Sequence, residues 1–223
     1  YDPVTDEWTE TSQNNAPESR YYASLVWAGS EMIVWGGSSR GEDYLNSGSR
    51  YNPFSDTWAA TSTVNAPEAR GGASVVWTGS EMIVWGGFGN NSGYLASGGR
   101  YNPATNVWTA ISTANAPEGR YNGVALWTGT EMIIWGGEGD DAVLNNGARY
   151  NPATDTWTAI SNTNAPAART EFDAVWTGTE MIVWGGYNDN WDVLGDGGRY
   201  NPATDTWTPL SSANAPAARA EHS

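Results

Sequence analysis

The sequence comprises 223 residues, with 25 acidic side chains against ten arginines and no lysine, which gives a net charge of −15 at pH 7. Phosphate backbones and anionic membrane surfaces repel such a chain, so we expect no nucleic-acid partner and no membrane insertion. Cysteine is absent, which excludes disulfides, thiolate catalysis and cysteine-ligated zinc or iron–sulfur sites.

The chain is built from an internal repeat of about 50 residues. Three markers recur: Tyr-Asn/Asp-Pro followed by Trp, Glu-Met-Ile-Val/Ile-Trp-Gly-Gly, and Asn-Ala-Pro with an arginine three residues after the proline. The first marker begins at Tyr1, Tyr51, Tyr101, Tyr150 and Tyr200. We therefore expect one supersecondary unit that is copied along the chain.

Each repeat begins with two apolar strands. In the first complete copy, residues 23–27 and 32–35 are predicted to form a tight hairpin around a turn at residues 28–30. Both strands are apolar on both faces, whereas a strand with one solvent-exposed face alternates polar and apolar residues. This pattern indicates sheets that are covered on both sides.

The second half of each repeat predicts a third strand and an outermost strand. The third strand ends near Tyr51-Asn52-Pro53, where Asn-Pro and the later Asp56 supply turn chemistry. The next segment alternates in the better copies, as in residues 156–159, which indicates one buried and one wet face. Four-stranded sheets with two apolar faces are satisfied by radial stacking, so the fold class we predict is all-β, a β-propeller.

The spacing of the di-glycine, the tyrosine and the tryptophan resembles that of the kelch-repeat family of β-propellers, of the bacterial secreted or surface type. The four sets begin with Gly36-Gly37, Tyr51, Trp58 and end with Gly185-Gly186, Tyr200, Trp207. The resemblance covers the whole chain, and kelch propellers include enzymes, scaffolds and adhesive modules. The abundance of Asn, Thr, Ser, Gly and Trp favours an extracellular or cell-surface microbial protein.

The markers predict a single kelch-like propeller, or a fragment of one, over residues 1–223, with four complete four-stranded blades and one incomplete blade. The complete blades span approximately residues 20–69, 70–119, 120–168 and 169–218. The incomplete blade is divided between residues 1–19 and 219–223 and lacks its second strand. Two explanations stay open: the chain is a fragment of a larger ring, or a second copy supplies the missing strand through self-association at open blade edges.

Tryptophan and arginine follow the repeat, which favours structural roles. All but one of the 14 tryptophans recur at fixed positions, and we expect them to pack between blades. All but one of the ten arginines occupy two registers, one before the repeated tyrosine and one after Asn-Ala-Pro. We expect them to bond carbonyls and carboxylates between blades, with the repeated glutamates as candidate partners: Glu31, Glu81, Glu131 and Glu180.

Recognition is expected where the repeats differ, because loops on a rigid scaffold carry function. The start of the inner strand and the loop after each di-glycine both differ, and a propeller places both on one face near the axis. The candidate ligand-binding residues are Tyr21, Tyr22, Tyr44, Phe88, Tyr94, Tyr121, Asn122, Asp140, Asp141, Glu171, Tyr187, Asp189, Trp191 and Asp192. Aromatic rings beside acids and amides suit a glycan or a peptide segment.

Constellations for catalysis or metal binding are weak in this sequence. Asp140-Asp141 and Asp189 with Asp192 offer oxygen ligands for calcium, but the calcium-loop pattern is absent. Copper-oxidase members of the kelch family need two histidines, and this chain has only His222. Paired carboxylates for glycoside cleavage stay open, with Asp141, Glu171 and Asp189 as the candidates. No Ser–His–Asp set, P-loop or dinucleotide fingerprint occurs.

We therefore predict a non-catalytic extracellular binding or adhesion module without a cofactor or metal, whose loop face binds a glycan or a protein. The first alternative is a structural subunit whose incomplete blade drives self-assembly into rings or filaments. The second is a glycoside-active propeller enzyme.

Overall fold

The computed structural model describes residues 1–39 and 43–221, so Arg40, Glu42 and His222 lie outside the described residues. Within these ranges the chain forms strands and turns without any helix. No helix long and apolar enough to cross a membrane therefore occurs in the part of the chain that the structure describes.

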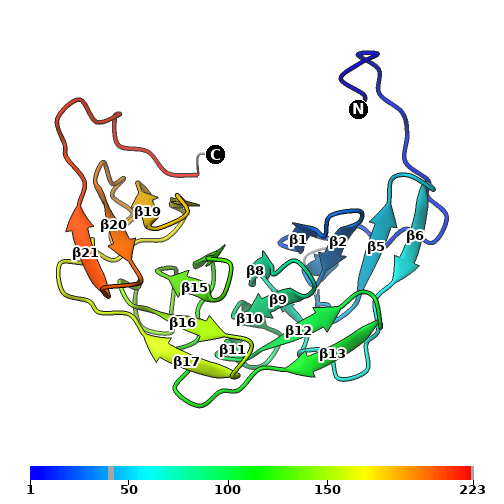
Figure 1. The fold of residues 1–223 in the computed structure, drawn as a ribbon, viewed down its shortest axis with the longest axis horizontal. Helices are drawn as coiled ribbons and strands as arrows, with labels where there is room; N and C mark the ends of the chain where they lie inside the picture. Colours follow the sequence, from blue (N-terminus) through cyan, green and yellow to red (C-terminus); the bar gives the residue numbers. More distant parts are fainter. Residues whose placement is uncertain (40–42, 222–223) are drawn as a thin grey trace.

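Four four-stranded antiparallel sheets follow one another in an open arc (Figure 1). Blade 1 contains β1 (Ser24–Trp27), β2 (Met32–Trp35), β5 (Gly48–Asn52) and β6 (Thr57–Ala60). Blade 2 contains β8 (Ser74–Trp77), β9 (Met82–Trp85), β12 (Gly98–Asn102) and β13 (Val107–Ala110). Blade 3 contains β14 (Val124–Trp127), β15 (Met132–Trp135), β16 (Gly147–Asn151) and β17 (Thr156–Ala159). Blade 4 contains β18 (Asp173–Trp176), β19 (Met181–Trp184), β20 (Gly197–Asn201) and β21 (Thr206–Pro209).

Each blade runs from an inner strand to an outer strand in chain order, which confirms the predicted order and the predicted hairpins. Five short strands belong to loops near the axis: β3 (Ser38–Ser39), β4 (Asp43–Tyr44), β7 (Arg70–Gly71), β10 (Phe88–Gly89) and β11 (Gly93–Tyr94). The all-β propeller architecture predicted from the repeat is therefore correct.

The di-glycine that follows each second strand is required by the backbone. Gly36 and Gly37 have φ angles of 70° and 85°, a left-handed region that other residues rarely adopt. A Cβ atom on Gly37 would lie 2.5 Å from the carbonyl oxygen of Tyr21. This close approach lets the loop after the di-glycine pair with the start of the inner strand.

The apolar core lies between the blades. One cluster joins Ile33 and Trp35 of blade 1 to Met82, Tyr101 and Trp108 of blade 2. The indole rings of Trp35 and Trp108 lie 5.1 Å apart, and the same pairing recurs between Trp85 and Trp157 and between Trp135 and Trp207. The predicted inter-blade role of the tryptophans is confirmed at these junctions.

One arginine register connects blades, as predicted, whereas the other bonds within its own blade. Arg149 lies 3.2 Å from Glu131 in its own blade and donates to the carbonyl oxygen of Pro202 in the next blade. The buried Arg120 donates to the carbonyl oxygens of Gly136 and Asn146. The bond to Gly136 supplies a donor to a buried carbonyl, whereas the Asn146 carbonyl also accepts from the backbone N–H of Gly136.

The segments assigned to a fifth blade form no ladder in the described part of the chain. Residues 1–8 keep the local turn of the repeat, with an isolated bridge between Asp2 and Glu7 and a bond from the Tyr1 hydroxyl to Asp6. Within residues 1–39 and 43–221 no second strand pairs with this turn, and Trp8 is 84% exposed. Figure 1 shows the two termini at opposite ends of the arc.

Blade 1 also differs from the prediction that every sheet is covered on both sides. Leu25 and Trp27 are 57% and 54% exposed, whereas Val75 and Trp77 at the same positions of blade 2 pack against the core shared with blade 1. The face of blade 1 that points away from blade 2 is therefore uncovered.

Replacing Asp155 by alanine is expected to lower the free energy of unfolding by about 1–3 kcal/mol, because its carboxylate joins two blades. It accepts bonds from the backbone N–H of Ser112 and from the hydroxyl of Tyr150. Asp155→Asn is the matched control, since Asn106 accepts the same two bonds at the equivalent position. Urea unfolding measures both variants, and equal stability of the two would contradict this role.

The same carboxylate predicts an acid dependence. The hydrogen bond from Ser112 chiefly holds the pKa of Asp155 below its ordinary value of 3.8, against the opposing effect of burial. The stabilisation by ionised Asp155 is thus complete above that value and is lost as the pH falls below it. The Asp155→Asn variant should lose less stability than the parent between pH 5 and roughly pH 2.

Candidate functional site

The two variable stretches of each repeat meet on one face of the propeller. β7 pairs with β10 in register Gly71 with Phe88. Isolated bridges join the equivalent positions in the other blades: Tyr21 with Ser38, Tyr121 with Glu138, and Thr170 with Tyr187. The loops that follow the di-glycines thus lie beside the starts of the inner strands, as the strand order predicted.

The residue after each of these paired positions has left-handed backbone. Its φ angle lies between 51° and 60° at Tyr22, Gly72, Asn122, Glu171 and Glu221. Side chains other than glycine and asparagine are strained in this conformation, at roughly 1 kcal/mol or more each. Other left-handed positions in each repeat keep Asp or Asn, whereas this register varies its side chain, which is the pattern expected of recognition rather than of folding.

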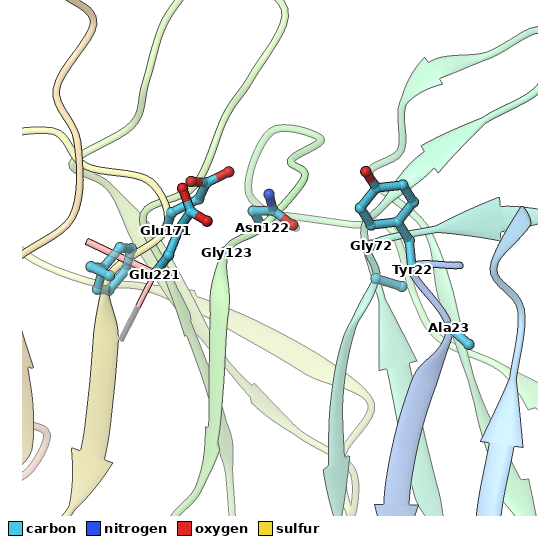
Figure 2. A pocket seen from close by; sticks show the side chains of 9 residues that line it. Tyr22, Ala23, Gly72, Asn122, Gly123, Glu171 and Glu221 are labelled. Atoms are coloured by element: carbon cyan, nitrogen blue, oxygen red, sulfur yellow. The ribbon is translucent and has the colours of Figure 1, made fainter. Parts of the chain in front are cut away.

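These positions line an open pocket of about 430 Å³ near the axis, together with Ala23, Gly123 and Phe172 among others. Figure 2 shows the carboxylates of Glu171 and Glu221 beside each other, with the Asn122 amide next to them and the Tyr22 ring further along. We call this the axial pocket.

The axial pocket concentrates negative charge. Burial raises the pKa of Glu171, and the neighbouring carboxylates of Glu221 and Glu138 raise it further. A cation placed between neighbouring carboxylates relieves their mutual repulsion, whereas an anion increases it. The axial pocket therefore favours cationic over anionic ligands.

A second, smaller pocket of about 220 Å³ lies on the same face and is built from three blades. Its lining is Tyr44 of blade 1, Phe88 and Tyr94 of blade 2, and Tyr121 and Glu138 of blade 3. The rings of Phe88 and Tyr94 meet edge to face at 5.1 Å, and Tyr44 lies 6.2 Å from Phe88. We call this the aromatic pocket; Tyr121, whose ring lies 6.2 Å from that of Tyr22, connects it to the axial pocket.

Blade 2 makes room for the aromatic pocket because it carries two glycines where the other blades carry side chains. A Cβ atom on Gly71 would collide with the Tyr44 ring. A Cβ atom on Gly72 would collide with the Tyr121 ring. The rings from blades 1 and 3 thus fill the space that Gly71 and Gly72 leave open.

The phenol groups of the aromatic pocket lie in a negative field. Burial raises the pKa of Tyr94, and the carboxylates of Glu138 and Asp140 add to the effect. Burial also raises the pKa of Tyr121, with contributions from Tyr22, Tyr44, Glu138 and Glu171. Both phenols stay protonated at neutral pH and present neutral ring faces.

The structure divides the sequence-predicted residues into several groups. Tyr22, Asn122 and Glu171 line the axial pocket, and Tyr44, Phe88, Tyr94 and Tyr121 line the aromatic pocket. Tyr187 and Trp191 stack at 5.4 Å on the loop of blade 4, where Trp191 is 63% exposed, and line neither pocket. Tyr21 is exposed and pairs with Ser38 through the backbone.

Some predicted residues have structural partners instead. Asp189 accepts a bond from the backbone N–H of Val143 in the preceding loop, and Asn90 bonds the backbone of Tyr44 in the same way. Asp192 bonds the Asn188 side chain. Asp140 and Asp141 are exposed, and within residues 1–39 and 43–221 no three acidic or histidine side chains gather as a metal site.

Sequence reasoning missed Glu138, Glu221 and the glycines of blade 2. Glu138 is the first residue after its di-glycine, the position that Phe88 and Tyr187 occupy in other repeats. The sequence alone shows that these three residues share one position in the repeat. It does not show the contribution of Gly71 and Gly72, because that contribution depends on rings from two other blades.

Pockets with a different character recur between each pair of blades on the side of the Glu–Arg pairs. One is lined by Glu81, Arg100 and Pro152, and the next by Glu131, Arg149 and Pro202. Because the same residues line each copy, these hollows belong to the scaffold.

The sequence matches the family model of the KLHDC2/KLHL20/DRC7 Kelch-repeats domain over residues 1–160 and 51–223. The two overlapping matches span the whole chain. The chain belongs to the kelch-repeat family. No curated protein matches the sequence. Kelch-repeat propellers are generally non-catalytic scaffolds that bind proteins. The loop face described above is the part of this propeller that varies between repeats.

Proposed function

We propose that this kelch propeller is a non-catalytic, extracellular binding or adhesion module whose loop face holds a protein ligand. The observation that carries the proposal is the adjacency of the axial and aromatic pockets on one face, built from residues that vary between repeats. Concave surfaces with aromatic walls and a few polar groups are typical of ligand sites. The extracellular assignment rests on composition alone, and a glycan ligand is the competing outcome of the test below.

A non-catalytic role is supported by the arrangement of the carboxylates. The carboxyl groups of Glu171 and Glu221 lie beside each other in the axial pocket (Figure 2). Glycoside hydrolysis needs two carboxyl groups roughly 5–9.5 Å apart, with room for a sugar or a water between them. Asp141 and Asp189, the other acids considered for this chemistry, line neither pocket.

The test is selection of ligands by the immobilised chain from a displayed peptide library and, in parallel, from a glycan array. Tyr22→Asn should weaken the selected peptides about tenfold, because it removes an exposed ring from the axial pocket. Asparagine suits the left-handed backbone, as Asn122 shows at the equivalent position. Phe54→Ala is the control, since Phe54 is fully exposed in an outer turn.

Peptides that bind the Tyr22→Asn and parent chains equally, or ligands found on the glycan array alone, would contradict a protein ligand on this face.

A second candidate function, self-assembly, is favoured by the uncovered faces at the two ends of the arc. Leu25 and Trp27 are exposed on blade 1, and Val175 is 57% exposed on blade 4. Inside the chain, the equivalent residues face each other across every junction, so the two open faces match as donor and acceptor of a head-to-tail contact. Light scattering on the same preparation decides: a stable monomer opposes assembly, and rings or longer species support it.

A further inference from the structure

We propose that the aromatic pocket binds the guanidinium group of an arginine side chain on the protein partner. This inference rests on the proposed function and names the chemistry that the loop face recognises. The shape of the pocket, its charge and its occurrence at a single place among the described blades support arginine as the ligand.

The shape of the aromatic pocket suits a planar cation. Phe88 and Tyr94 stand edge to face, with an angle of 86° between their planes, and Tyr44 and Tyr121 complete the walls from the neighbouring blades. A cation over the face of an aromatic ring is attracted by the electrons of the ring, and arginine makes such contacts more often than lysine. The rings are half-buried, so part of a bound side chain would leave water.

The charge of the aromatic pocket is negative and has no internal counter-ion. The Glu138 carboxylate accepts a bond from the Thr170 hydroxyl at its Oε1 atom and has no ion-pair partner among residues 1–39 and 43–221. The nearby Arg120 donates to Glu118, Gly136 and Asn146 and is not directed at Glu138. A ligand must therefore supply the positive charge.

The aromatic pocket is unique among the repeats. In blade 4 the position of Phe88 is occupied by Tyr187, but the positions of Tyr44 and Tyr94 are occupied in blades 3 and 4 by Val143 and Val193. The glycine pair Gly71-Gly72, which leaves space for the Tyr44 and Tyr121 rings, occurs in blade 2 alone. Packing demands of the propeller, which are met in every blade, therefore do not explain this set of residues.

Arginine fits better than the other organic cations. Its guanidinium lies flat on a ring while its edge donates to a carboxylate, so Phe88 or Tyr94 and Glu138 are satisfied together. A quaternary ammonium carries no N–H donor and would leave the free oxygen of Glu138 without a hydrogen bond. Lysine donates to Glu138 but has no plane to stack.

The experiment is an NMR titration of the 223-residue chain with acetyl-arginine-methylamide, against acetyl-citrulline-methylamide as a neutral isostere. We expect the citrulline probe to bind about tenfold more weakly, and Phe88→Ala and Glu138→Gln each to weaken the arginine probe about fivefold. Phe54→Ala and Glu10→Gln, which change exposed residues of the same types, should leave its affinity unchanged. The acetyl-lysine-methylamide and choline probes should bind more weakly than arginine.

Equal binding of the arginine and citrulline probes, or equal losses in the test and control variants, would overturn the proposal. If selected peptides bind through Tyr22 but the arginine probe does not bind, the inference fails while the proposed function stands. If the arginine probe binds as expected but the display selections give no ligand, the inference stands and the proposed function fails.

Discussion

Replacing Trp108 by alanine is expected to lower the free energy of unfolding by about 3–5 kcal/mol. Trp108 is 2% exposed, its ring lies between Trp35 of the preceding blade and Tyr101 of its own, and its indole N–H donates to the carbonyl oxygen of Ser62. The substitution removes the ring from the junction between blades 1 and 2 and leaves that carbonyl without its donor. Urea unfolding followed by circular dichroism measures the loss.

Trp8 is the matched control because it occupies the same position of the repeat. It is 84% exposed and packs against no other blade in the described part of the chain, although it still touches the ring of Tyr1. Trp8→Ala should change the free energy of unfolding by no more than about 0.5 kcal/mol. Similar losses in the two variants would mean that the indoles do not act through inter-blade packing.

Arg120→Ala is expected to cost about 3–5 kcal/mol, by a different mechanism. The guanidinium is buried and donates to three backbone carbonyls, those of Glu118, Gly136 and Asn146, and to the Asn146 side chain. Burial lowers its pKa to about 10, so the group remains charged at neutral pH. Alanine would leave the buried Gly136 carbonyl without this donor and would remove the bonds to Glu118 and Asn146.

Arg219 provides the control at the equivalent position of the last repeat. It is exposed, donates to the carbonyl oxygen of Ala217, and lies 5.8 Å from the centre of the Trp184 ring. Arg219→Ala should cost about 0.5–1 kcal/mol, the range for an exposed cation–π contact. An Arg120→Ala variant as stable as Arg219→Ala would contradict a structural role for the buried register.

The architecture was predictable because the same physical demand appears in every repeat. Apolar strands such as Met82–Trp85 must be covered on both faces. The outer strand buries Trp108 and leaves the residues on either side of it exposed. The strand order and the junctions between blades could therefore be predicted from one copy of the repeat. The pairing of Arg149 with Glu131 was predictable for the same reason, since both residues recur at fixed spacing.

The candidate site was predictable only in part. Variable positions identified Tyr44, Phe88 and Tyr121, but the sequence does not show that their rings converge across three blades. Convergence depends on the missing side chains of Gly71 and Gly72, which is a tertiary effect. Asp189 was predicted as a ligand-binding residue, although its carboxylate bonds the backbone of Val143 in a loop far away in the sequence.

The backbone of the axial pocket was equally hidden from the sequence. Tyr22, Glu171 and Glu221 adopt left-handed φ angles although their side chains disfavour them. This strain recurs at the same register of the repeat. A ligand meets these side chains already oriented, which reduces the conformational entropy lost on binding.

The most direct test of the account locates a bound arginine side chain on the loop face. With acetyl-arginine-methylamide labelled with ¹³C, isotope-filtered NOE spectra should connect its Cδ protons to the ring protons of Phe88 and Tyr94. Contacts to Trp27 or Leu25 on the open face of blade 1 in place of these, at a probe concentration that saturates the chain, would contradict recognition by the aromatic pocket.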